Sequence, residues 1–387
     1  MRILLATAVA IAPLLVASEA MANVVINTAR TTPIRTSTAT GTGPDSIEIQ
    51  TNGAINVTSG TAVTVDSNHN LQILGGAVTM AGSADGSTGV LVQPGVTSTL
   101  TINGLVNVGD SIGDYPDTDN DGDLDGPWAT GTGRYGIRYA GGAPATGDLL
   151  INSGGAVTVD GNNSYGVSIE SGLIGKFQSL GNIRVVGDNS AAVHTSGTIT
   201  GAVNLLGNIQ ARGLNTSAVS INGDVGGRIA LQGGIDSSGY RYTSRGSDEF
   251  IKKLEPEDLL QGGPAVIIAA NVGAGVIVDR TPTESDANST DDDNDGIPDG
   301  SETTGAINSY GSAAAIQIGS ATSSITLGAA GTGDNAFGFI NRGTIAGQGV
   351  YDGITATALV IGGNAGQTTT ITGGVRNGGS ISSLSIG

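Results

Sequence analysis

Short runs of alternating apolar and polar residues, separated by glycines, recur along most of the chain. In the segments VSI (167–169) and IRV (183–185), an apolar residue stands at every second position. This is the periodicity of a β-strand and differs from the 3.6-residue period of a helix. The intervening glycines permit turns with positive φ. The pattern therefore predicts many short strands joined by tight turns.

The clearest of these runs form a repeat. Segments 164–189, 190–215 and 216–241 are each 26 residues long and align without gaps. Apolar residues and glycines then fall into columns. The columns are Val167, Val193 and Val219; Leu173, Ile199 and Val225; Phe177, Val203 and Ile229; Ile183, Ile209 and Ile235; Gly175, Gly201 and Gly227; and Gly181, Gly207 and Gly233.

A unit of three short strands with one apolar face becomes stable only when copies stack and the columns merge into a continuous core. Looser copies occur over residues 89–108, 136–159, 265–278, 313–327 and 358–371. We therefore expect an all-β fold, a parallel β-helix or β-solenoid of roughly ten to twelve coils, each rising about 4.8 Å. A β-propeller is the alternative, but its blades need about 40 residues and more aromatic side chains.

Composition supports a thin, repeated core. The chain has 65 glycines among 387 residues, and aromatic residues make up only 3% while apolar residues reach 38%. Cysteine is absent, which excludes disulfides, thiol catalysis and thiolate metal sites. His69 and His194 are the only histidines, which argues against a multi-histidine metal centre.

The N-terminus has the three parts of a secretory signal peptide. Met1 and Arg2 precede an apolar run over residues 3–17, and Ala20 and Ala22 form a small-residue cleavage site. A transmembrane anchor is the alternative, but the run is short for a span. We predict a signal peptide over 1–22, an N-terminal lead-in or cap over 23–45, and the solenoid over 46–387.

Negative charge is concentrated outside the repeats. The formal net charge is −18, and 20 of the 34 acidic residues lie within 110–125, 248–258 and 284–302. These residues belong to three predicted insertions, at about 110–133, 241–262 and 281–305. So acidic a chain is expected to repel nucleic acid and to attract cations.

Two insertions carry a calcium-binding pattern. In the third insertion, Asp291, Asp293, Asp295 and Gly296 are followed by Glu302, which completes D-x-D-x-D-G-x5-E. Alternate carboxylates of a tightly curled loop converge as hard oxygen ligands, and the glycine permits the bend. We predict a structural calcium site here. A solvated acidic loop is the alternative.

The first insertion has the same beginning. Asp117, Asp119, Asp121 and Gly122 match the pattern, but Trp128 stands where the final glutamate is expected. Asp123 or Asp125 can compensate for the missing ligand, so a second calcium site is predicted.

The sequence DNDGIPDG (293–300) resembles the calcium loops of thrombospondin type 3 repeats. The resemblance implies side-chain ligands from the aspartates and a backbone carbonyl from one residue. The implied ligands are Asp291, Asp293, Asp295, Asp299 and the carbonyl of Ile297, and in the first loop Asp117, Asp119, Asp121 and Asp125.

The middle insertion has a different character. Within DEFIKKLEPEDLLQ (248–261), apolar residues come at near-helical spacing, interrupted by Pro256. These residues are Phe250, Ile251, Leu254, Leu259 and Leu260. We predict a short helix that docks on the solenoid. A protrusion that binds a partner is the alternative.

The arrangement over residues 46–387 resembles the passenger region of bacterial autotransporters, the pertactin-like right-handed parallel β-helices. The shared features are the signal peptide, the absence of cysteine, and Gly/Asn/Thr-rich repeats with GxI or GxV strand starts. The resemblance implies export to the cell surface or outer membrane of a Gram-negative bacterium, or beyond it. It also implies an adhesive or structural role toward host or neighbouring-cell glycans or proteins. An outer-membrane β-barrel translocator is expected with such a passenger, but this sequence lacks the aromatic girdles of a barrel.

A calcium-dependent enzyme that acts on polysaccharides is the alternative function, because some parallel β-helices cleave acidic polysaccharides with calcium and a nearby cation. The candidate cations are Arg134, Arg138, Lys176, Arg184 and Arg212, which form no compact group in the sequence. His194 follows Val193 in a strand and is expected to face solvent. We therefore expect a protein without catalytic activity.

Overall fold

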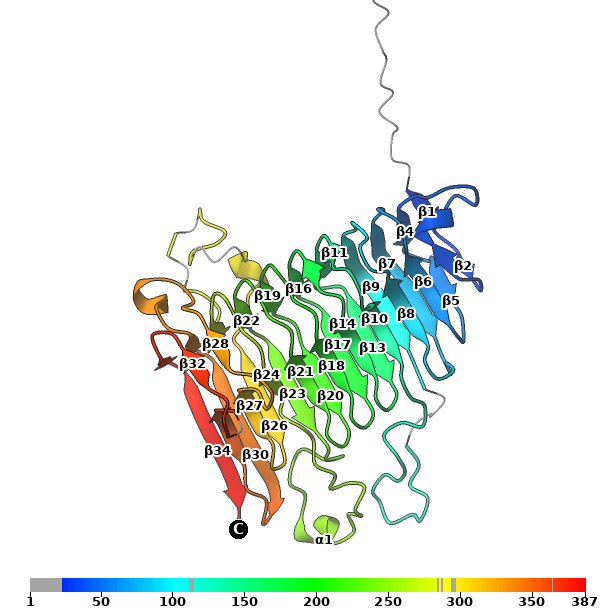
Figure 1. Cartoon of the computed structure of the whole chain (residues 1–387). Coiled ribbons are helices and arrows are strands. Elements are labelled where there is room, and N and C mark those ends of the chain that lie inside the picture. Colours follow the sequence, from blue (N-terminus) through cyan, green and yellow to red (C-terminus); the bar gives the residue numbers. More distant parts are fainter. Residues whose placement is uncertain (1–22, 111–114, 284, 287, 294–296, 364) are drawn as a thin grey trace, which may run out of the picture.

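The chain forms a stack of parallel β-coils in a computed structural model (Figure 1). The structure describes residues 23–110, 115–283, 285–286, 288–293, 297–363 and 365–387. The predicted signal peptide over 1–22 lies outside the described residues. Most coils contribute a strand to each of three faces, and these strands run in the same direction as those of the neighbouring coils, which confirms the predicted parallel β-solenoid.

Three faces surround the core. The first face contains β1 (Val24–Ile26), β4 (Ile47–Gln50), the first halves of β7 (Leu71–Met80) and β9 (Leu100–Val108), β12 (Leu149–Ile151), β16 (Phe177–Ser179), β19 (Val203–Leu205), β22 (Ile229–Leu231), β25 (Val276–Val278), β29 (Phe339–Asn341) and β33 (Val375–Asn377).

The second face follows the first within each coil. It contains β2 (Ala29–Arg30), β5 (Ala54–Asn56), the second halves of β7 and β9, β13 (Ala156–Asp160), β17 (Asn182–Val186), β20 (Ile209–Arg212), β23 (Gly234–Ser238), β26 (Ala306–Tyr310), β30 (Thr344–Asp352) and β34 (Ser380–Ile386).

The third face is a sheet of ten strands. These are β3 (Ile34–Arg35), β6 (Thr61–Val65), β8 (Thr88–Val92), β10 (Tyr135–Tyr139), β14 (Tyr165–Ile169), β18 (Ala191–Thr195), β21 (Ser217–Ile221), β24 (Val266–Ile268), β27 (Ala314–Ile318) and β31 (Thr357–Ile361). Residues 23–45, predicted as a lead-in or cap, supply β1, β2 and β3, which pair with β4, β5 and β6.

Smaller elements lie at the corners. Two strand pairs, β11 (Ala145–Thr146) with β15 (Leu173–Ile174) and β28 (Ile325–Leu327) with β32 (Thr369–Ile371), lie between the third face and the next coil. The helical elements are α1 (Asp248–Ile251) and the 3-10 turns η1 (Thr36–Thr38), η2 (Asp299–Ser301) and η3 (Gly333–Asn335). Over the described part of the chain, no helix is long and apolar enough to cross a membrane.

The apolar columns of the sequence are columns of the core. Val167 pairs with Val193, which in turn pairs with Val219, and all three side chains are fully buried. The columns that begin at Leu173, Phe177 and Ile183 are in register in the same way. Stacked apolar side chains, most of them valine, isoleucine and leucine, thus form a single continuous core along the rod.

Some of the recurring glycines adopt the predicted positive φ, as Gly233 does at φ 70, but others have a different reason. An ideal Cβ on Gly207 would lie 2.0 Å from the carbonyl oxygen of Gly181, one coil away, and Gly207 is not among the residues with positive φ. Close approach of neighbouring coils therefore excludes side chains at such positions. The left-handed corner is instead formed by Asn189 and Asn215, both at φ 54, and the amide of Asn215 donates to that of Asn189 at 3.3 Å.

The insertions leave the stack at two different corners. The first lies between β9 and β10 and the middle one between β23 and β24, so both leave between the second and third faces. The third lies between β25 and β26, where the first face meets the second. In Figure 1 the first and middle insertions hang side by side below the rod, and the third extends from the opposite side.

Candidate metal centre

Three carboxylates of the first insertion converge. One oxygen each of Asp117, Asp119 and Asp121 lies within 4.8 Å of the others. The loop curls because Gly122, the sixth residue of the pattern, adopts φ 101, as expected for this position. The backbone N–H of Asp121 donates to the carboxylates of Asp117 and Asp119 at 3.1 and 3.2 Å. The alternate aspartates thus face one point, as divalent-cation ligands do.

Asp123 is the buried member of this loop. The residue is only 2% exposed, and among the described residues its Oδ2 has no hydrogen-bond partner. Burial, together with the neighbouring carboxylates of Asp258 and Asp121, raises the pKa of Asp123 to about 7. Asp258 belongs to the middle insertion, so this carboxylate sits where the two insertions meet.

Asp125 belongs to a second acidic group. The hydroxyl and the backbone N–H of Thr118 both donate to its carboxylate, and they lower its pKa. One oxygen each of Asp125, Glu255 and Glu257 lies within 4.8 Å of the others. These side chains line a cleft of about 490 Å³ between the first and middle insertions. Of the five acids predicted in the first loop, Asp117, Asp119 and Asp121 therefore form one group, Asp125 belongs to another, and Asp123 is in neither.

Trp128, which stands in place of the final glutamate, anchors the first insertion to the middle one. Its indole N–H donates to the carbonyl of Gly239 at 3.3 Å, and its side chain is buried. The guanidinium of Arg241 lies 5.0 Å from its ring centroid and 4.7 Å from that of Tyr115. The departure from the calcium pattern thus serves contact between the insertions.

A buried ion pair lies at the same contact. Arg241 Nε donates to Asp258 Oδ1 at 2.9 Å, and their side chains are 3% and 1% exposed. Arg241 Nη2 also donates to the carbonyl of Gly126 at 2.5 Å. Across the loop, Lys253 Nζ donates to the carbonyl of Asp121. Arg241 and Lys253 thus reach from the middle insertion into the first one.

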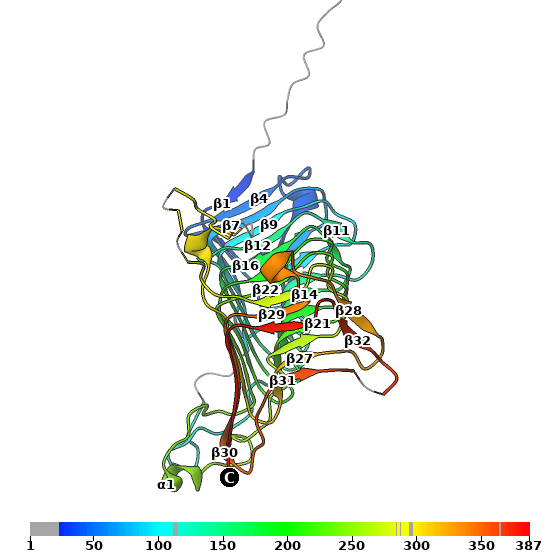
Figure 2. The same cartoon turned by 90° about the vertical axis from the view of Figure 1, so that its left-hand side faces the viewer.

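The middle insertion packs against the solenoid, although its helix is shorter than the spacing of its apolar residues suggests. Only Asp248–Ile251 is helical, with Ser247 as N-cap at 3.3 Å from Phe250 N. A second apolar cluster takes up the remaining residues. It consists of Tyr240, Val350 and Tyr351, with Ile251, Leu254, Leu259, Tyr310 and Ile354 packed against them. The middle insertion therefore rests on the extended end of β30, as Figure 2 shows.

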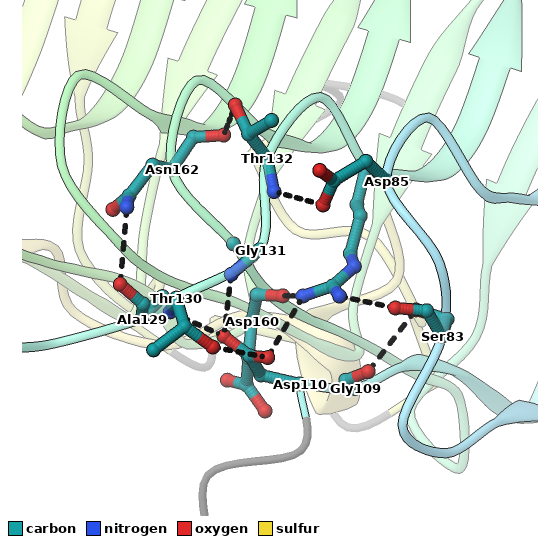
Figure 3. Close-up of polar contacts among 12 residues, drawn as sticks. Ser83, Asp85, Gly109, Asp110, Ala129, Thr130, Gly131, Thr132, Asp160 and Asn162 are labelled. Carbon is teal, nitrogen blue, oxygen red and sulfur yellow. Dashed lines mark hydrogen bonds and ion pairs between the residues drawn. The ribbon is translucent and has the colours of Figure 1, made fainter.

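The base of the first insertion is clamped to the rod. The carboxylate of Asp110 accepts hydrogen bonds from the backbone N–H groups of Thr130 and Gly131 at 2.6 and 3.0 Å (Figure 3). Arg134 Nη1 lies 3.3 Å from the same carboxylate, and both side chains are 4% exposed. The outgoing and returning ends of the insertion are thereby tied together.

The third insertion holds its acids differently. Glu302 is buried against the stack, where Gln232 Nε2 donates to its Oε1 at 2.7 Å. The carboxylate of Asp299 accepts from the backbone N–H of Asp292 at 3.1 Å. Ile297 is buried, while Asp291 and Asp293 are more accessible. Asp295 and Gly296 lie outside the described residues, and within the remainder of this loop no three carboxylates come as close as those of the first.

Four of the five cations considered for an enzyme are held in structural contacts. Arg134 belongs to the clamp, Arg138 forms a bidentate pair with Glu170 at 2.8 and 2.9 Å, and Arg184 lies 3.5 Å from Asp160. Lys176 Nζ donates to Gln178 at 3.3 Å, and Arg212 is half-buried at the second face. His194 is partly exposed on β18, pairs in register with Ser168 and Ser220, and stacks on Tyr165 at 4.9 Å.

Sequence reasoning missed the acids of the middle insertion. Glu255, Glu257 and Asp258 approach the first loop, although more than 125 residues separate them from Asp125. The available signal was the cluster of five acids within 248–258. Comparisons with protein-family models, with curated proteins and with solved structures found no match.

Proposed function

We propose that this chain is an exported structural or adhesive protein of the bacterial cell surface, a β-solenoid that displays calcium-stabilised insertions. The observation that carries the calcium assignment is the convergence of Asp117, Asp119 and Asp121 within 4.8 Å. Asp123 supports it, because a buried carboxylate oxygen beside other carboxylates requires a cation or a proton. Calcium accepts six to eight oxygen ligands in flexible geometry, which suits such a loop.

The third loop is proposed as a second calcium site. Its ligands would be Asp291, Asp293, Asp295, the carbonyl of Ile297, Asp299 and Glu302. The hydrogen bond from Gln232 to Glu302 is the kind of outer contact that orients a ligating carboxylate. In both loops the metal would order a segment that has few apolar side chains of its own.

The structural or adhesive role rests on the architecture and on the ion pairs formed by three of the candidate arginines. A rod of stacked coils exposes its insertions far from the core, and surface display uses extended scaffolds of this kind. An enzyme acting on acidic polysaccharides would need cations available to the substrate. Arg134, Arg138 and Arg184 are instead paired with Asp110, Glu170 and Asp160.

Limited proteolysis with calcium and with a chelator tests the metal assignment. Chelation should accelerate cleavage within 110–133 and 281–305 while the far-ultraviolet strand signal stays unchanged, because the core contains no acidic loop residues. Identical cleavage under both conditions would refute the calcium sites. Two assays test the structural or adhesive role. One measures binding of the protein to cells or glycans, and the other measures release of unsaturated product from polyuronates. Product release without binding would favour the enzyme.

A further inference from the structure

The first acidic loop lacks the final ligand of its pattern, and the middle insertion places a carboxylate beside it. Trp128 occupies the twelfth position and packs under Arg241. Asp258, 1% exposed, lies next to Asp123 at the contact between the insertions. A ligand from another part of the chain can therefore complete the site.

The surroundings of Asp123 call for a cation. Its Oδ2 is buried, its carboxylate neighbours are Asp121 and Asp258, and among the described residues no donor reaches this oxygen. Arg241 is engaged with Asp258 and the carbonyl of Gly126, and Lys253 donates to a backbone carbonyl. Neither cation neutralises Asp123 directly, although both lie close to it in the fold.

We propose that the calcium ion of the first loop is shared between the two insertions, with Asp123 and Asp258 joining Asp121 as ligands. This inference rests on the proposed calcium function and adds a consequence to it. Calcium would then hold the middle insertion against the first. The ion would add to the Arg241–Asp258 pair and to the apolar contacts with β30, and Lys252 and Lys253, which follow the four-residue α1, are exposed.

The chain provides a direct readout of this coupling. Its only lysines are Lys176, Lys252 and Lys253, and the last two are exposed in the middle insertion. A protease that cuts after lysine therefore probes the middle insertion and cannot cut the first. The single tryptophan, Trp128, reports calcium at the first loop by its fluorescence.

The test uses the full chain titrated with calcium chloride. At free calcium ten times the dissociation constant, cleavage after Lys252 and Lys253 should slow about ten-fold, because the open population falls by that factor. Asp123→Asn leaves the Arg241–Asp258 pair intact and should weaken calcium binding at least about ten-fold, the loss typical of an outer-shell partner. Protection at both lysines should disappear with it.

Asp258→Asn should weaken calcium binding by a similar factor, seen in Trp128 fluorescence. Because it also removes the partner of Arg241, the relevant quantity is the cleavage rate without calcium divided by the rate with calcium, which should fall from about ten to about one. Glu249→Gln removes an exposed acid on α1 and should leave the ratio unchanged. Glu257→Gln tests the neighbouring group of Asp125, Glu255 and Glu257 and should also leave it unchanged.

The outcomes separate the inference from the function on which it rests. Suppose that Trp128 fluorescence reports calcium binding, that Asp117→Asn abolishes this binding, and that cleavage at Lys252 and Lys253 is independent of calcium. The shared site would then be wrong, and the calcium function would stand. Loss of protection in Glu257→Gln with normal Asp258→Asn would place the ion in the cleft and overturn the proposal. Absence of any calcium binding would refute both.

Discussion

The two acidic loops begin with the same pattern and end in different surroundings. The third loop has the complete motif, and its last residue, Glu302, is hydrogen-bonded to Gln232 of the stack beneath it. The first loop lacks the final glutamate, yet its aspartates converge and its Trp128 contacts a second insertion. The first loop therefore shows that aspartates can converge without the final glutamate of the motif. A loop that meets another segment can use its last position for packing.

The largest effect on stability is expected from the Arg241–Asp258 ion pair, which lies beside the first loop and not beside the third. Arg241→Gln leaves Asp258 buried beside Asp123 without its guanidinium, which should lower the local free energy of opening of the middle insertion by about 3–5 kcal/mol in calcium-free solution. Hydrogen exchange of amides within 241–262 measures this change. Amides of the third insertion should keep their exchange rates.

The matched control for Arg241→Gln is Arg245→Gln. Arg245 pairs with Asp352, whose side chain is 61% exposed, so its loss should cost at most about 1 kcal/mol. Equal exchange in the two variants would mean that the buried pair does not hold the insertion.

A smaller effect should follow when the first loop is given the motif of the third. Trp128→Glu completes the pattern, and motif logic alone predicts tighter calcium binding. The packing predicts the opposite, because the buried indole and its contacts with Arg241 and Gly239 are lost, at a cost of about 3 kcal/mol. Calorimetric titration with calcium decides between the two.

Trp128→Phe keeps an aromatic ring under Arg241 and should retain most of the docking, with lysine cleavage close to that of the unchanged chain. Tighter calcium binding in Trp128→Glu, with normal cleavage, would show that the twelfth position is a ligand position in both loops.

The smallest effect is expected at the third loop. Glu302→Gln keeps an oxygen that accepts from Gln232 and removes one carboxylate charge, so folding should change little while calcium affinity falls about ten-fold, or about 1.4 kcal/mol. Calcium titration of the Asp117→Asn background isolates the third site. Unchanged affinity would assign Glu302 to the stack alone.

The coils were predictable from the sequence because the columns depend on local periodicity and a constant repeat. Val167, Val193 and Val219 are in register, as their 26-residue spacing predicts. The predicted positive φ holds for Gly233 but not for Gly207, where the neighbouring coil lies too close to admit a side chain. Distance between coils is a tertiary property that composition does not report.

The meeting of the insertions was not predictable, because nothing in a sequence says at which corner an insertion leaves. Asp258 looked like one acid of a helical segment, but the helix ends at Ile251. Beyond it, Leu254 and Leu259 pack into the cluster of Tyr240 and Tyr351. Burial of these two leucines determines the local conformation more strongly than their helical spacing does. The same packing brings Asp258 to the first loop.

The first insertion acts as a strap along the rod. It leaves after β9, and the strands that follow on the same face are β13, β17, β20 and β23, so its contact with Gly239 spans four coils, about 19 Å. In a simple stack each coil senses only its neighbours, and unravelling can proceed one coil at a time. Because the first insertion links these four coils, we expect them to unfold together. A force that unfolds the rod from either end should therefore meet its greatest resistance at these coils.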